Sequence, residues 1–96
     1  MGAGQGRPGV GVTYKIEVRP AALRALRRID RQDQPRIQAA ITLLAQDPRP
    51  PGAKALQGRD GLRVRVGSYR IIYTVDDGLL LVVVVTLGHR SDVYDR

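Results

Sequence analysis

Apolar and polar residues alternate with a period of two over residues 14–19 and 62–66. Side chains of a strand point alternately to its two faces, so this pattern predicts two strands. Residues 69–75, which are mostly apolar with Arg70 among them, predict another strand. An apolar run rich in valine, residues 79–87 with Thr86 as its one polar member, predicts a fourth strand that is buried on both faces and central in the sheet. Between the last two strands, Asp76-Asp77-Gly78 predicts a hairpin turn.

Residues 20–29 and 35–46 repeat with a helical period instead. Pro20 and Pro35 suit the first turn of a helix, and Asp33 or Gln34 is the expected cap of the second one. The apolar stripes expected to face the core are Ala22, Leu23, Leu26 and Ile29 in the first helix and Ile37, Ala40, Ile41 and Leu44 in the second. The arginines of the first helix, Arg24, Arg27, Arg28 and Arg31, fall on its other side.

The order of elements is therefore β-α-α-β-β-β, which predicts an α+β fold. We expect a mostly antiparallel four-stranded sheet with an αα-hairpin packed on one face and the other face exposed. Residues 1–12 are rich in glycine and cannot build a core, so we expect a flexible tail. Residues 13–96 then form a single domain.

The chain of 96 residues carries a formal net charge of +7, almost entirely from arginine. Such a surface attracts polyanions such as nucleic acid or an acidic protein. Cysteine is absent from the sequence, which excludes disulfides and thiolate sites. We find no secretion signal, and the longest apolar run is too short to cross a bilayer, so we expect a cytoplasmic protein with no membrane partner.

Arginines on the predicted strands are the strongest chemical signal. Arg63 and Arg65 are two residues apart and project from the face opposite the helices. Arg70, on the neighbouring strand, reaches the same face, and Arg90 follows the last strand. A guanidinium offers a planar fork of donors that matches phosphate, although exposed strand positions also carry arginine as solvated charge. Lys54 and Arg59, in the loop before these strands, are further candidates for RNA binding.

Cleavage of RNA needs no cofactor, because the 2′-OH is a built-in nucleophile. We find no spacing typical of metal ligands, so we expect no metal. Proton removal from the 2′-OH needs a base, and the candidates near the arginines are Tyr94 and His89. Nearby cations lower the pKa of a tyrosine, and histidine titrates near neutral pH. Alternatively, Tyr94 packs on the sheet edge and His89 hydrogen-bonds backbone.

Three segments carry a resemblance to a known family. They are Leu56-Gln57-Gly58, the stretch LRVRVGSYRIIY over residues 62–73, and LGHRSDVY over residues 87–94. Together with the linker Asp-Pro-Arg-Pro before them, they resemble the RelE branch of the RelE/ParE toxin superfamily over residues 13–96. The resemblance implies the βααβββ fold and a toxin of a type II toxin–antitoxin system. RelE-type toxins enter the ribosomal A site and cut mRNA there, which makes the expected activity that of an endoribonuclease.

The resemblance also implies the roles of single residues. Arg63 and Arg65 occupy positions that are often lysine in the family, Arg70 matches its strand arginine, and Arg90 its post-strand arginine. Tyr94 matches the family's C-terminal catalytic tyrosine. Arginine does not readily donate a proton, so protonation of the leaving group would fall to His89 or to water.

The expected partners are the ribosome, mRNA and a cognate acidic, RelB-like antitoxin that forms a hetero-oligomer with the toxin. Two other functions remain open. A ParE-like toxin of the same fold inhibits DNA gyrase by binding, and a basic module could bind RNA or an acidic partner without catalysis.

Overall fold

The computed structural model describes residues 13–89. The expected tail, residues 1–12, and the candidate residues Arg90 and Tyr94 lie outside this range. In chain order, the elements of the described part are β1 (Lys15–Val18), α1 (Pro20–Arg28), α2 (Gln34–Leu44), β2 (Lys54–Ala55), β3 (Leu62–Val66), β4 (Tyr69–Asp76) and β5 (Leu81–His89). The α+β fold with two helices ahead of the main sheet strands is confirmed.

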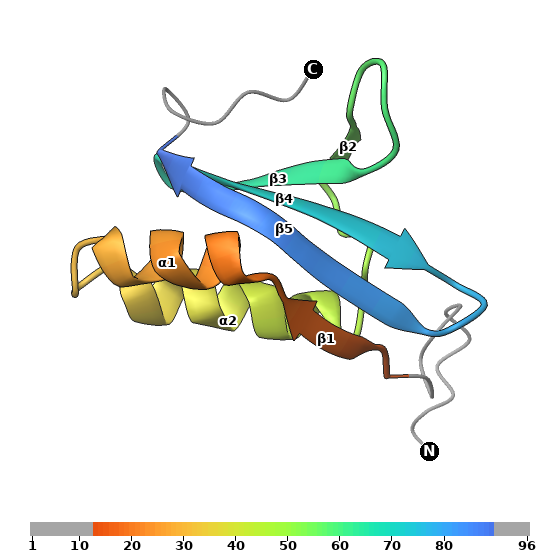
Figure 1. Ribbon diagram of the computed structural model, residues 1–96, viewed down its shortest axis with the longest axis horizontal. Coiled ribbons are helices and arrows are strands. Elements are labelled where there is room, and N and C mark those ends of the chain that lie inside the picture. The colour runs from red at the N-terminus through yellow and green to blue at the C-terminus, as the bar shows by residue number, and fades with distance from the viewer. Residues whose placement is uncertain (1–12, 90–96) are drawn as a thin grey trace.

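Within residues 13–89 the sheet has five strands in the order β1-β5-β4-β3-β2 (Figure 1). β1 runs parallel to β5, and every other neighbouring pair is antiparallel. The predicted number of four strands is wrong by one, because the two-residue strand β2 pairs with the start of β3. Two residues are too few to show an alternating pattern, so the sequence carries no signal for β2.

Both helices cover one face of the sheet (Figure 1). Their buried residues meet the inward-facing residues of β4 and β5 in one core, which comprises Ala22, Ile29, Ile37, Ile41, Leu44, Ile71, Tyr73, Val82, Val84 and Leu87. Leu23 was expected in this core but is 40% exposed, and Ala25 packs against the core instead. Neither α1 nor α2, the helices of the described part, is long and apolar enough to cross a membrane.

Asp33, one of the two residues expected to cap α2, is its N-cap residue. Its backbone is already helical, however, and its side chain makes no capping bond. Its carboxylate instead accepts a hydrogen bond of 3.0 Å from the hydroxyl of Tyr69. Asp33 therefore ties the start of α2 to the start of β4.

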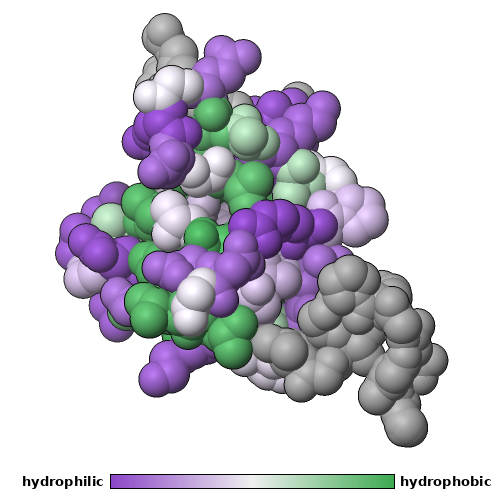
Figure 2. Space-filling view, turned by 90° about the vertical axis from the view of Figure 1, so that its right-hand side faces the viewer, coloured by the Kyte–Doolittle hydropathy of each residue, from purple (hydrophilic) through white to green (hydrophobic). Residues whose placement is uncertain are grey.

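The turn between β4 and β5 is longer than predicted. Asp76 pairs with Leu81, so residues 77–80 form a four-residue loop, in which Leu80 has a left-handed φ of 53°. The Asp76 carboxylate stabilises this loop by accepting the backbone N–H of Leu79 at 2.9 Å. Leu79, expected in a strand, is 71% exposed. Figure 2 shows the side of the molecule at this turn, where hydrophobic residues reach the surface between hydrophilic ones.

A β-bulge interrupts the pairing of β4 with β5. Tyr73 pairs with Val84 and Ile72 with Thr86, so Val85 is an extra residue in β5. Because of this extra residue, Val84 and Leu87 both point to the helices, while Val85 is 36% exposed. β5 lies inside the sheet, between β1 and β4, as expected. The prediction that it is buried on both faces is wrong, because the face away from the helices is only partly covered.

Hydrogen bonds from side chains close the end of the core next to the β4–β5 turn. The buried Tyr73 donates its hydroxyl to the carbonyl of Pro48 at 2.7 Å, and burial raises its pKa to about 12. Arg49, next in the chain, makes two hydrogen bonds to Asp77, at 3.1 Å and 3.0 Å. The hydroxyl of Tyr14 donates to the same carboxylate at 2.6 Å. The segment after α2, the β4–β5 turn and the start of β1 are thereby joined.

Candidate nucleic-acid interface

The face of the sheet away from the helices carries the arginines of β3. Leu62, Val64 and Val66 pack against the core on the helix side. Because side chains alternate along a strand, Arg63 and Arg65 project from the opposite face. The sequence-based assignment of these two residues agrees with the observed register.

Arg70 of β4 projects from the same face. Arg65 and Arg70 are direct partners in the antiparallel ladder, and such partners have Cβ atoms about 5 Å apart. On the other side of β3, Lys54 is the direct partner of Arg63. These four residues, Lys54, Arg63, Arg65 and Arg70, form a patch across β2, β3 and β4 that we call the cationic face.

The arginines of the cationic face differ in how firmly they are held. Arg65 and Lys54 are exposed, whereas Arg63 and Arg70 are half-buried. The Nε atoms of Arg63 and Arg70 are buried, so the inner side of each guanidinium is packed among protein atoms. This packing disfavours the alternative that these two arginines are only solvated charge. Like charges on directly paired residues destabilise a sheet, which an anion bound between them would offset.

A loop folds over part of this face, which was expected to be fully open. Leu56 is buried against Ile72, whose side chain points to the cationic face beside Arg63. The backbone N–H of Leu56 donates to the carbonyl of Gly61 at 3.0 Å and closes the loop. Arg59 is exposed on this same loop, so the loop adds a cation next to the sheet arginines. In the sequence, an isolated apolar residue in this loop, Leu56, is the feature that could have predicted that the loop packs on the sheet.

His89 does not join the cationic face. It pairs with Tyr69, and the two rings meet edge to face with centroids 5.3 Å apart and planes at 67°. Both side chains lie on the helix side of the sheet, whereas the residue paired with Arg70 is Gly88. The expectation that His89 lies beside the sheet arginines is therefore not supported by the register. Partial burial and the hydrogen bond to Asp33 raise the pKa of Tyr69.

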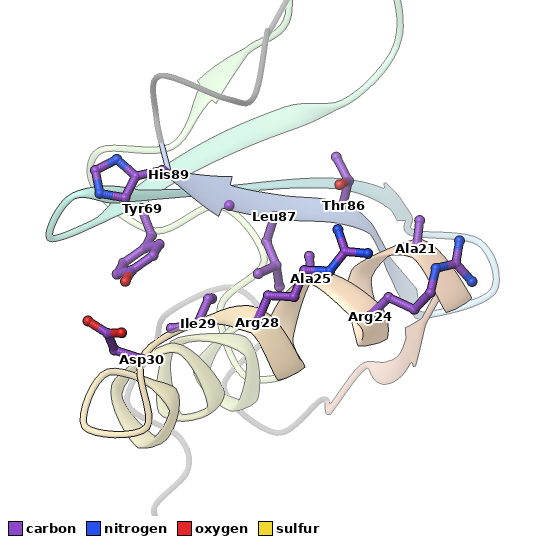
Figure 3. Close-up of a pocket in the computed structure, with 11 residues that line it drawn as sticks. Ala21, Arg24, Ala25, Arg28, Ile29, Asp30, Tyr69, Thr86, Leu87 and His89 are labelled. Carbon is purple, nitrogen blue, oxygen red and sulfur yellow. The ribbon is translucent and has the colours of Figure 1, made fainter.

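A second feature, which we did not expect from the sequence, is a groove of about 580 Å³ between α1 and the end of β5 (Figure 3). Arg24 and Arg28 line it, and the side chain of Arg28 extends from α1 toward β5. The sequence predicted these arginines only as the solvent side of a helix, because the groove depends on how α1 lies against the sheet.

Within residues 13–89, no three or more His, Cys, Asp or Glu side chains gather in a way that could hold a metal ion. The groups that the cationic face offers to a ligand are therefore guanidinium and ammonium groups. They can bind phosphates and stabilise negative charge.

Comparison with known proteins gives one consistent result. Residues 16–94 match the family model described as the ParE toxin of the type II toxin–antitoxin system parDE. Toxin RelG of Mycobacterium tuberculosis is 30% identical over 89 residues, which cover 86% of this chain and 98% of RelG.

Solved structures agree with this result. The toxin–antitoxin complex RelBE2 of Mycobacterium tuberculosis contains a chain that is 28% identical, with a TM-score of 0.63 over 82% of this chain and 100% of that one. The archaeal RelE–RelB complex of Pyrococcus horikoshii gives a TM-score of 0.71 at 23% identity, over 84% of this chain and 99% of that one, and shows the shared fold.

Proposed function

Because this chain belongs to the RelE/ParE superfamily of type II toxin–antitoxin toxins, we propose that it is an endoribonuclease that cuts mRNA in the ribosomal A site and thereby stops translation. The observation that carries the proposal is the cationic face, where Arg65 and Arg70 are direct partners and Arg63 lies two residue pairs along β3 on the same face. A site built of packed, adjacent arginines suits a phosphodiester whose negative charge increases during cleavage.

Each residue has a defined role in this reaction. The guanidinium groups of Arg63, Arg65 and Arg70 bind the scissile phosphate and stabilise its additional charge, with Arg90 as a fourth such group. Tyr94 removes the proton from the 2′-OH or orients it for attack. Lys54 and Arg59 bind neighbouring phosphates of the RNA. Water protonates the leaving 5′ oxygen, because His89 lies on the other side of the sheet.

The proposed partner outside the ribosome is a cognate, acidic, RelB-like antitoxin. The solved relatives are named as complexes of RelE with RelB, and this chain carries a net charge of +7 that an acidic protein would neutralise. Action on the ribosome requires a cytoplasmic protein.

Inhibition of DNA gyrase is a second candidate, favoured by one observation: the family model that matches is that of ParE. A supercoiling assay with purified gyrase tests it directly. The arginines favour the ribonuclease, because inhibition by binding does not require adjacent guanidinium groups whose stems are packed on one face.

The test of the ribonuclease is cleavage of a defined mRNA by the purified chain, with and without programmed ribosomes. We expect cleavage on ribosomes only, slowed about 10² to 10³-fold by Arg70→Ala, which removes one group that stabilises charge in the transition state. Tyr94→Phe should slow cleavage strongly as well. Arg31→Ala is the matched control, since Arg31 is an exposed arginine between the helices. Full activity of Arg70→Ala, or inhibition of gyrase without any cleavage, would refute the proposal.

A further inference from the structure

The groove beside α1 exists because β5 is longer than its neighbour β1. The last residue pair between them is Val18 with Val84, followed by a hydrogen bond from the N–H of Arg19 to the carbonyl of Val84. In the described part of the chain, residues 85–89 of β5 have no strand on this side, so they form an edge of the sheet. α1 packs beside this edge, and the groove lies between the two (Figure 3).

At this edge the groove meets the cationic face. Thr86 and Gly88 of β5 line the groove, and their partners in β4 are Ile72 and Arg70, which project from the face away from the helices. Neighbouring strands of a sheet lie about 5 Å apart. An RNA chain bound at Arg70 therefore has only β5 to cross before it enters the groove, and it crosses at Gly88, a residue without a side chain.

Two arginines of α1 give the groove a spacing that suits the backbone of RNA. Arg24 and Arg28 both line it and are one helical turn apart, about 6 Å along the helix axis, which is close to the separation of consecutive phosphates in a single strand. The side chain of Arg28 extends toward β5 (Figure 3). A guanidinium binds a phosphate through parallel hydrogen bonds, so the two arginines can hold neighbouring phosphates.

The end of the groove at His89 suits a base rather than a phosphate. The rings of Tyr69 and His89 line this end and meet edge to face, with centroids 5.3 Å apart. His89 is exposed, and an edge-to-face contact covers at most one face of its ring, so the other face can stack on a base. Asp30 lies at the same end (Figure 3). Its carboxylate repels phosphate but accepts hydrogen bonds from the amino groups of bases.

We propose that the groove is a nucleotide-binding subsite for a single-stranded part of the RNA beside the cleavage site. The inference rests on the proposed function, whose substrate it extends from the cationic face around the edge of β5. Phosphates lie along Arg24 and Arg28, and one base stacks on His89. The groove volume of about 580 Å³ lies within the range of sites that bind small ligands, which leaves room for a nucleotide. The affinity for RNA therefore depends on its length.

The test measures this dependence with fluorescent 2′-O-methyl RNA, which cannot be cleaved. A chain of about four nucleotides covers the cationic face alone, and one of about ten nucleotides covers the groove as well. Wild type should bind the longer RNA at least about 10-fold more tightly, because one stacked base and two phosphate contacts are added. Arg24→Ala with Arg28→Ala should lose most of this gain. The matched control, Arg27→Ala with Arg31→Ala, removes two exposed arginines that do not line the groove and should keep the gain.

A second measurement detects the stacked base directly. An adenine analogue whose fluorescence falls when it stacks is placed at each position of the longer RNA in turn. At saturating protein, wild type should quench one position that His89→Ala does not quench. His89→Phe, which keeps an aromatic ring, should restore the quenching. A purely structural role of His89 would not produce this pattern.

Three outcomes would overturn the subsite. Equal losses of length dependence in the two double variants would mean that only net charge matters. The same quenching by wild type and His89→Ala would mean that no base stacks there. Polyglutamate that binds wild type but not Arg24→Ala with Arg28→Ala, while RNA binds both equally, would mean that the groove holds an acidic protein segment.

The nuclease itself is decided by a different readout. Binding to RNA that cannot be cleaved requires neither ribosomes nor catalysis. Length-dependent binding through the groove without any cleavage of mRNA would refute the nuclease and leave the subsite. Cleavage on ribosomes without a contribution of the groove to binding would do the reverse.

Discussion

Single residues at the β4–β5 turn show how exposed charges contribute to this fold. Asp77 accepts hydrogen bonds from Arg49 and Tyr14, although the side chains of Arg49 and Asp77 are more than half exposed. The bonds from Arg49 and then Tyr14 lower the pKa of Asp77, and the bond to Asp77 raises the pKa of Tyr14. Exposed ion pairs usually add little stability, but here one carboxylate joins three distant segments.

The lowered pKa of Asp77 predicts a loss of stability in acid. A carboxyl group whose folded pKa is depressed stabilises the fold above its ordinary pKa, here 3.8, and this contribution disappears as the pH falls through the lower folded value. Asp77→Asn should therefore lower the melting temperature slightly at pH 7. The difference from wild type should shrink as the pH falls below about 4.

Thermal unfolding followed by circular dichroism between pH 2 and pH 7, on the order of ten points, measures this difference. Asp60→Asn is the control, because Asp60 is an exposed carboxylate in the loop over the sheet. A difference between wild type and Asp77→Asn that stays constant with pH would contradict the argument.

At the scale of elements, the loop over residues 56–61 supports the cationic face. It presses Leu56 onto Ile72, next to Arg63, and is closed by Gly61, whose φ is 130°. Residues other than glycine rarely adopt this conformation. A Cβ on Gly61 would lie 2.8 Å from Cδ1 of Leu56 and 3.2 Å from the carbonyl oxygen of Tyr73. The loop can therefore approach the sheet only with glycine at this position.

Gly61→Ala should lower the free energy of unfolding by about 2 to 3 kcal/mol, the sum of backbone strain and a steric conflict. Gly58→Ala is a matched control, because Gly58 also has a positive φ, 77°, but a Cβ there meets nothing within 4 Å. It should cost about 1 kcal/mol. Urea denaturation of both variants measures these values. Equal losses would mean that the contact between Leu56 and Gly61 has no part in holding the loop.

Alternation and helical period in the sequence predict most of the elements, and the reasons for the failures are physical. β3 carries clean alternation because only one of its faces is covered by helices, whereas β4 breaks the alternation at Ile72, which Leu56 covers on the other face. Residues 79–85, which include the start of β5 and the bulge at Val85, are all apolar. A run without polar residues shows neither where a strand begins nor where its alternation shifts by one residue. β2 is defined by its partner rather than by its own two residues.

The same bulge explains which part of the candidate site could be predicted. Arg63, Arg65 and Arg70 were assigned to one face correctly, because the strands that carry them pair without interruption. His89 follows Val85, and one extra residue in a strand reverses the side of every residue after it. The groove beside α1 could not be predicted, because it depends on the lengths of β1 and β5 relative to each other.

At the scale of the whole molecule, the part of the chain that the structure describes carries arginines on two opposite sides, the cationic face and α1. The cationic face carries arginines whose stems are packed on the sheet, whereas α1 carries arginines on an exposed helix. Both groups contribute to long-range attraction of polyanions, but only contacts with phosphates release counterions. Each arginine carries the same single charge, wherever it lies. The salt dependence of RNA binding can therefore show whether an arginine contacts phosphate or only attracts RNA from a distance.

Binding of a fluorescent single-stranded 2′-O-methyl RNA, which cannot be cleaved through its 2′ oxygen, is expected to weaken steeply with salt. Each phosphate contact contributes about 0.7 to the slope of log K against log salt concentration. Arg65→Ala should therefore reduce this slope by about 0.7, because Arg65 is the exposed arginine at the centre of the cationic face. Arg27→Ala removes the same charge from the exposed side of α1 and should weaken binding slightly with no change of slope. Equal changes of slope in the two variants would mean that RNA contacts the molecule without preference for the sheet.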